Sequence, residues 1–105
     1  MQNDIKAIAD HYGYEPQSRQ LIEEMAELTI AINKYWRSVN AIVQTPERAW
    51  ETDKAAKNIA EEIADVEIVL EQMKYMLGNS EVIEDIKQQK ITRQLYRIKE
   101  EVRNG

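Results

Sequence analysis

The sequence predicts an all-α protein, an antiparallel bundle of about four helices in a single domain over residues 1–105. Glycine and proline are rare, with three and two in 105 residues. They lie between or at the ends of the long candidate helices and not within them. Apolar residues recur at the three- and four-residue spacing of amphipathic helices, and no long stretch alternates as a strand would. The length suits one domain and is too short for two ordinary ones.

The first two helices are predicted around Gly13 and Pro16. A short helix over about 3–12 would end at Gly13, since glycine readily adopts the left-handed conformation that terminates helices. Pro16 suits the first position of a long helix over about 16–43, where its missing N–H costs nothing.

The same signals recur further along the chain. Thr45 and Pro46 predict the cap and first residue of a helical region that runs to Leu77, with a break near 52–53. Residues 78–80, Gly-Asn-Ser, predict a stop and a new cap, followed by a last helix to about residue 103.

Such helices would leave apolar surface uncovered in one chain. The last helix carries apolar residues at a 4-3-4 spacing, which suits packing on a partner helix: Ile91, Leu95, Ile98 and Val102. We therefore expect oligomerisation to complete the bundle.

Composition excludes several classes of function. Cysteine is absent and His11 is the only histidine, which excludes disulfides, thiolate catalysis and metal sites of several histidines in one chain. The net charge of −5 argues against nucleic acid as the main partner. The N-terminal stretch lacks the apolar core of a signal peptide, and no apolar run is long enough to span a membrane. We expect a cytoplasmic protein that binds no membrane.

The segment LIEEMAEL, residues 21–28, places acids close to a core-facing stripe. Leu21, Met25 and Leu28 are expected to face the core. At about 100° per residue, Glu24 lies within the stripe, Glu27 lies at its edge about 60° away, and Glu23 faces solvent.

The segment over residues 60–77 repeats this arrangement. Glu62 lies within the apolar stripe, Asp65 lies about 60° to the same side, and Glu61 points away. Carboxylates that converge at low exposure repel one another, and a hard divalent cation with oxygen ligands relieves that repulsion. Mg²⁺ is the expected cation, with Mn²⁺ as an alternative.

Two alternatives need no metal. The acids could be solvated charges at the edge of ordinary amphipathic helices, or they could form buried ion pairs with Lys87, Lys90 or Arg93. A di-iron bundle fits less well, because it requires Glu-x-x-His on two helices.

Glu24-Met-Ala-Glu27 followed by Glu62-Ile-Ala-Asp65 resembles the E-x-x-E … E-x-x-D signature of MazG-like, all-α nucleoside-triphosphate pyrophosphohydrolases, over roughly residues 15–97. The resemblance implies that Glu24, Glu27, Glu62 and Asp65 hold Mg²⁺. It implies cleavage of a (d)NTP to a monophosphate and pyrophosphate, in house-cleaning or control of the nucleotide pool. It also implies a homodimer or homotetramer. Among these acids, Glu27 is our candidate to orient or deprotonate the attacking water.

Four further residues are candidates for substrate binding. Lys90 and Arg93 share a basic helix edge and would contact phosphate, while Gln20 lies one turn before Glu24 and would bind base or phosphate. Trp36 is a candidate for stacking on the base, although packing is the commoner role of an aromatic residue. The alternative function is a non-catalytic helical module for oligomerisation or interaction on the same scaffold.

Overall fold

The predicted helices are present in the computed structural model, which describes the chain in full except for the side chains of Ile42 and Val43. The elements are α1 (Gln2–Tyr12), α2 (Tyr14–Gln44), the short 3₁₀ helix η1 (Pro46–Arg48), α3 (Ala49–Leu77) and α4 (Ser80–Asn104). The described residues include no strand, which confirms the all-α prediction. None of these helices is long and apolar enough to cross a membrane.

Two predicted boundaries are wrong in detail. Helix α2 begins at Tyr14, so Pro16 is its third residue and not its first. Proline is still tolerated there, because the first four N–H groups of a helix have no intrahelical acceptor. Thr45 and Pro46 do start a helical region, but as the 3₁₀ turn η1, and α3 then runs without the break expected near 52–53.

Gly78 ends α3 as predicted. Its φ of 62° lies in the left-handed region, and its N–H donates to the carbonyls of Lys74 and Tyr75 at 2.9 and 3.3 Å. A residue with a Cβ is strained in this conformation, whereas glycine is not. The chain therefore leaves the α3 axis here, and Asn79 precedes α4.

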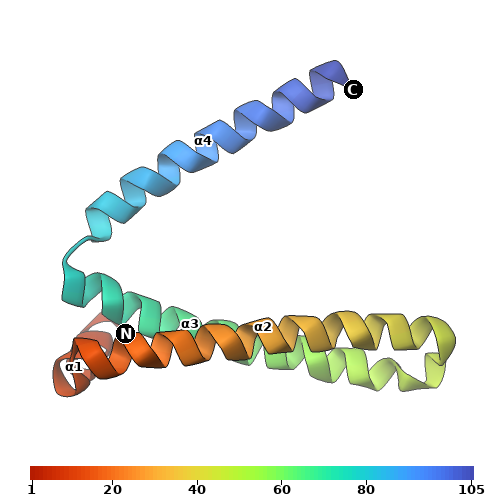
Figure 1. Cartoon of the computed structure of the whole chain (residues 1–105), viewed down its shortest axis with the longest axis horizontal. Coiled ribbons are helices and arrows are strands. Elements are labelled where there is room, and N and C mark those ends of the chain that lie inside the picture. Colours follow the sequence, from red (N-terminus) through yellow and green to blue (C-terminus); the bar gives the residue numbers. More distant parts are fainter.

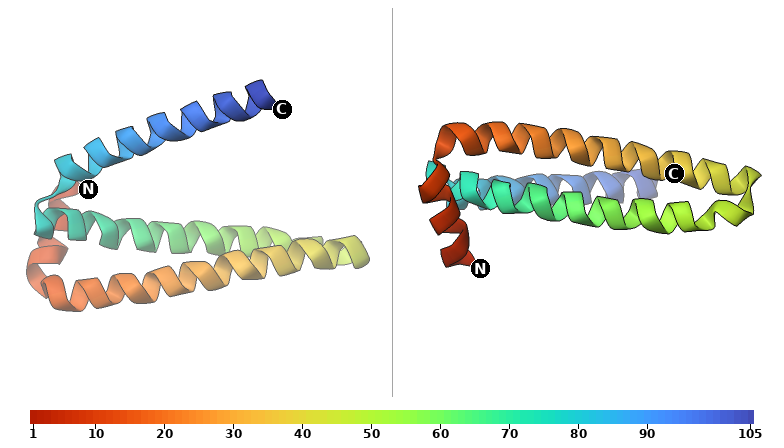
Figure 2. Two further views of the ribbon diagram at one scale, coloured as in Figure 1. Left: turned by 45° about the horizontal axis from the view of Figure 1, so that its top comes forward. Right: turned by 90° about the horizontal axis from the view of Figure 1, so that it is seen from below.

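Helices α2 and α3 form the central antiparallel hairpin, and they lie side by side in each view (Figures 1 and 2). Their contact buries small apolar residues, namely Ala31, Ala55, Val66 and Val69. Gln72, only 1% exposed, accepts a hydrogen bond from Gln17 Nε2 at 2.8 Å across this contact. The pairing satisfies polar groups that would otherwise be costly to bury.

Helix α1 packs at the open end of the hairpin, mainly on α3. Ala9 is buried there, and Tyr75 Oη donates to Asp10 Oδ1 at 2.8 Å. The ammonium group of Lys6 lies 5.7 Å from the centre of the Tyr75 ring, within the range of a cation–π interaction. Tyr75 thus joins α1 to the end of α3.

Helix α4 diverges from the hairpin (Figure 1) and, within the part of the chain that the structure describes, packs on no other helix. The radius of gyration is 18.5 Å, whereas a compact domain of this length has about 13 Å. Ile91, Leu95, Ile98 and Val102 are all exposed. The apolar face predicted to need a partner is therefore left open by the residues that the structure describes.

The hairpin also exposes part of its apolar stripe. Leu21 and Leu28 are half-buried as predicted, but Met25, expected in the core, is 52% exposed. The α2–α3 contact centres near Glu24 and Glu62, so residues about 80–100° away lie outside it. We call these residues, Met25, Ile32, Ile63 and Leu70, the apolar flank. Because α2 and α3 are antiparallel, residues at the same angle from Glu24 on α2 and from Glu62 on α3 lie on the same side of the hairpin.

The buried glutamine pair yields a test of the hairpin contact. Gln72→Leu should lower the free energy of unfolding by about 1–3 kcal/mol, because Gln17 Nε2 loses its acceptor while still buried. The double variant Gln17→Leu/Gln72→Leu should recover most of this loss, since no polar group is then left unpaired. Urea denaturation followed by circular dichroism measures both, and equal destabilisation of the two variants would contradict the pairing.

Candidate metal centre

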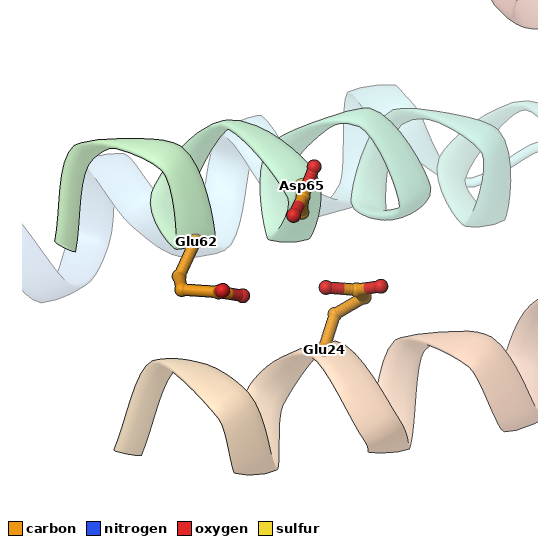
Figure 3. A group of neighbouring side chains, drawn as sticks. All are labelled: Glu24, Glu62 and Asp65. Atoms are coloured by element: carbon orange, nitrogen blue, oxygen red, sulfur yellow. The ribbon is translucent and has the colours of Figure 1, made fainter. Parts of the chain in front are cut away.

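Three of the four acids predicted as metal ligands meet between α2 and α3. Glu24 comes from α2, and Glu62 and Asp65 come from successive turns of α3 (Figure 3). One carboxylate oxygen from each lies within 4.8 Å of the others. Glu24 and Glu62 are half-buried and Asp65 is exposed, so the group opens to solvent on one side. We call these three residues the carboxylate cluster.

Glu62 is the most perturbed member of the cluster. Its Oε2 atom is buried and has no hydrogen-bond partner among the described residues. Burial raises the pKa of Glu62 above its ordinary value of 4.5, and the negative charges of Asp65, Glu24, Glu27 and Glu61 raise it further. An oxygen in this position has lost water without gaining a donor, which is unfavourable for the ionised form.

Gln20 lies where the sequence analysis placed it, beside Glu24. Its Nε2 donates to Glu24 Oε1 at 2.7 Å, and the bond is partly buried. The second oxygen of Glu24 remains available for another partner. Gln20 therefore holds the Glu24 carboxylate in place.

Glu27 lies outside the group of three and is exposed. Its charge nevertheless contributes to the raised pKa of Glu62, so it is close enough to act on the cluster electrostatically. By helical angle Glu27 and Asp65 lie on the same side of the hairpin, opposite the apolar flank. We call this side the acidic flank.

The structure does not bring the other predicted binding residues to the cluster. Lys90 and Arg93 share a shallow surface hollow with Gln94 and Arg97 on α4, which points away from the hairpin. Trp36 is exposed on α2, and its ring lies 6.2 Å from that of Tyr35. Twelve residues separate it from Glu24, which is about 18 Å along the helix axis.

Ion pairing does not explain the cluster. Over the described chain, no lysine or arginine lies within salt-bridge distance of Glu24, Glu62 or Asp65. Lys87, considered above as a partner, instead contacts Glu84 on its own helix at 3.2 Å. Among the described residues, the cluster is therefore a set of carboxylates without a cationic partner.

The donor set fits a hard divalent cation. It offers only oxygen atoms, and Mg²⁺ is commonly bound by one or two carboxylates together with water and phosphate. The Oε2 atom of Glu62 has no hydrogen-bond partner among the described residues, and the Glu24–Gln20 bond orients a second carboxylate.

The structure also brings together a group of basic residues, away from the cluster, that the sequence did not single out. Lys34 and Arg37 of α2 and Lys54 of α3 line a common groove towards the closed end of the hairpin. Each is unremarkable on its own helix, and only the pairing of α2 with α3 brings them together.

Comparison with protein-family models, with curated proteins and with solved structures finds no match to this chain.

The raised pKa of Glu62 predicts a stability change that depends on pH. At pH values between 4.5 and the raised pKa of Glu62, this carboxyl group loses its proton in the unfolded chain and keeps it in the folded chain. Glu62 therefore favours folding at low pH, and this contribution is lost as pH rises through its folded-state pKa. Without divalent cations, Glu62→Gln should raise the melting temperature at pH 7 and change it little at pH 4.

Thermal unfolding in EDTA at the two pH values measures this difference. Glu67→Gln is the matched control, because Glu67 is exposed on the same helix and does not perturb Glu62. A Glu62→Gln protein that melts below the unmodified protein at pH 7 would contradict the repulsion inferred here.

Proposed function

We propose that this protein is a Mg²⁺-dependent nucleotide pyrophosphohydrolase that cleaves a (d)NTP to a (d)NMP and pyrophosphate, in house-cleaning or control of the nucleotide pool. The observation that carries the proposal is the carboxylate cluster, in which a buried oxygen of Glu62 has no hydrogen-bond partner among the described residues. The order of the acids, E-x-x-E followed by E-x-x-D on two helices, supports it through the resemblance to MazG-like enzymes.

Each acid has a role in this proposal. Glu24, Glu62 and Asp65, joined by Glu27, would hold the cation, and Gln20 would keep Glu24 oriented through its hydrogen bond. The bound cation would neutralise phosphate charge and orient the phosphates for attack by water. Glu27, exposed beside the cluster, would accept the proton of that water. The water oxygen would form a bond to the α-phosphorus. The bond from this phosphorus to the oxygen that bridges the α- and β-phosphates would break, and pyrophosphate would leave.

We further propose that the active form is a homodimer or homotetramer. The apolar flank of the hairpin and the apolar face of α4 are both exposed, and each has the spacing of a helix contact. Packing between copies would bury these two apolar surfaces and would allow Lys90 and Arg93 of one copy to approach the acids of another.

The alternative is a non-catalytic helical module for oligomerisation or interaction. The exposed apolar faces also favour this function, since they serve assembly whether or not the acids bind a metal. Only the enzyme would release pyrophosphate from a nucleoside triphosphate, which distinguishes the two functions.

Metal binding and turnover test the enzyme directly. Mg²⁺ at about 100 times its Kd should raise the free energy of unfolding by about 2.7 kcal/mol. Pyrophosphate should be released from at least one of the NTPs and dNTPs. Glu62→Gln should abolish both effects, whereas Glu23→Gln should retain them because Glu23 is exposed and outside the cluster. Stabilisation by Mg²⁺ without hydrolysis of any nucleotide would favour the non-catalytic module.

Assembly is tested by placing a charge on the apolar face of α4. Leu95→Asp/Ile98→Asp should reduce the molecular mass in solution from that of an oligomer to that of a monomer, because the buried interface cannot accommodate unpaired carboxylates. Size-exclusion chromatography with light scattering measures the mass. Gln89→Asp, on the opposite side of α4, is the control, and an unchanged mass in the double variant would contradict this interface.

A further inference from the structure

The groove at the closed end of the hairpin is separate from the carboxylate cluster and has the opposite charge. It has a volume of about 390 Å³ and is formed by α2, η1 and α3. Six of its lining residues matter for the inference: Lys34, Arg37, Arg48, Trp50, Lys54 and Asn58. We call it the basic groove.

The charges of the basic groove are only partly compensated. Four cations line it together with one acid, Glu51. Arg48 Nε and an Nη atom donate to the two oxygens of Glu51, each at 2.9 Å, so this acid is already engaged. Lys34, Arg37 and Lys54 form no ion pair with any residue that the structure describes. The groove therefore keeps an excess of positive charge on a chain whose net charge is −5.

The geometry favours an anion with more than one charged group. Lys34 and Arg37 lie one turn apart on α2, about 4.5 Å along its axis, while Lys54 approaches from α3. Converging cations repel one another, and a phosphate chain that contacts several of them relieves that repulsion. The volume also exceeds what a single phosphate fills.

The basic groove and the acids lie on the same side of the hairpin. By helical angle, Lys34 and Lys54 share the acidic flank with Glu27 and Asp65. Asn58 precedes Glu62 by four residues, which is about 6 Å along α3. Lys54 precedes Glu62 by eight residues and Lys34 follows Glu24 by ten, which is about 12 and 15 Å along the two helices. An anion held by these lysines would therefore lie about two to three helical turns from the carboxylate cluster.

We infer that the basic groove binds the di- or triphosphate part of a small molecule, and that this binding needs no metal ion. Lys34, Arg37 and Lys54 supply the charge, and the Asn58 side chain is placed to donate a hydrogen bond. Trp50, 61% exposed, offers an aromatic face beside the phosphates. The inference is independent of hydrolysis, because none of these residues belongs to the carboxylate cluster.

Nuclear magnetic resonance of the tryptophan indoles tests this site without a metal. The chain has two tryptophans, and only Trp50 lines the groove, so Trp36→Phe assigns the two indole signals. Inorganic pyrophosphate, titrated in EDTA, should shift the Trp50 signal to saturation and leave that of Trp36 unchanged. Sulfate at matched ionic strength should shift the Trp50 signal much less.

The variant Lys34→Gln/Lys54→Gln should weaken pyrophosphate binding by about tenfold for each lost cation. Lys57→Gln, exposed on α3 outside the groove, should retain full affinity. An unshifted Trp50 signal, an equal response to sulfate, or equal affinity in the double variant would overturn the inference. The titration is then repeated with Glu62→Gln. This variant should lose hydrolysis and still bind pyrophosphate, so the result distinguishes the basic groove from the proposed hydrolytic site.

Discussion

The close contact between α2 and α3 is the constraint on which the rest of the molecule depends. Ala31 and Ala55 leave room for the two helices to approach, and the Gln17–Gln72 hydrogen bond lies within the same contact. This antiparallel pairing places Glu24 opposite Glu62. The convergence of carboxylates follows from the packing, and burial of Glu62 together with the neighbouring negative charges raises the pKa of that residue. Folding of the hairpin thus assembles charges that repel one another.

The hairpin has two sides with different chemistry. One side leaves a large part of each of four apolar side chains exposed: Met25, Ile32, Ile63 and Leu70. The opposite side carries Glu27, Asp65 and the basic groove. In the proposed enzyme, apolar burial and phosphate chemistry would use opposite sides, so a copy packed against the first side would leave the second open to a small ligand. The arrangement is suited to a site that stays accessible in an assembly.

Local features of the sequence were predicted well, and features that depend on two elements were not. The angle of Glu24 or Glu62 around its helix is fixed by 100° per residue, so their inward position follows from sequence alone. Gly78 likewise marked the end of its helix, where the structure gives it a left-handed conformation. The exposure of Met25 and the meeting of Lys34 with Lys54 depend on which part of each stripe the partner helix covers, and periodicity does not specify that. The direction of α4 depends on the backbone angles of Gly78 and Asn79, which helical periodicity does not specify either.

In the proposed oligomer, the left-handed turn at Gly78 would make folding depend on protein concentration. Only Gly78 and Asn79 separate α3 from α4, so their backbone angles set the direction in which α4 leaves the hairpin. A helix directed away from its own hairpin is placed to exchange with that of a second copy, as in domain swapping. If two chains exchange α4 in this way, each chain folds fully only when it associates with the other, so folding and association form one equilibrium. Dilution alone would then destabilise them, with no change in sequence or solvent.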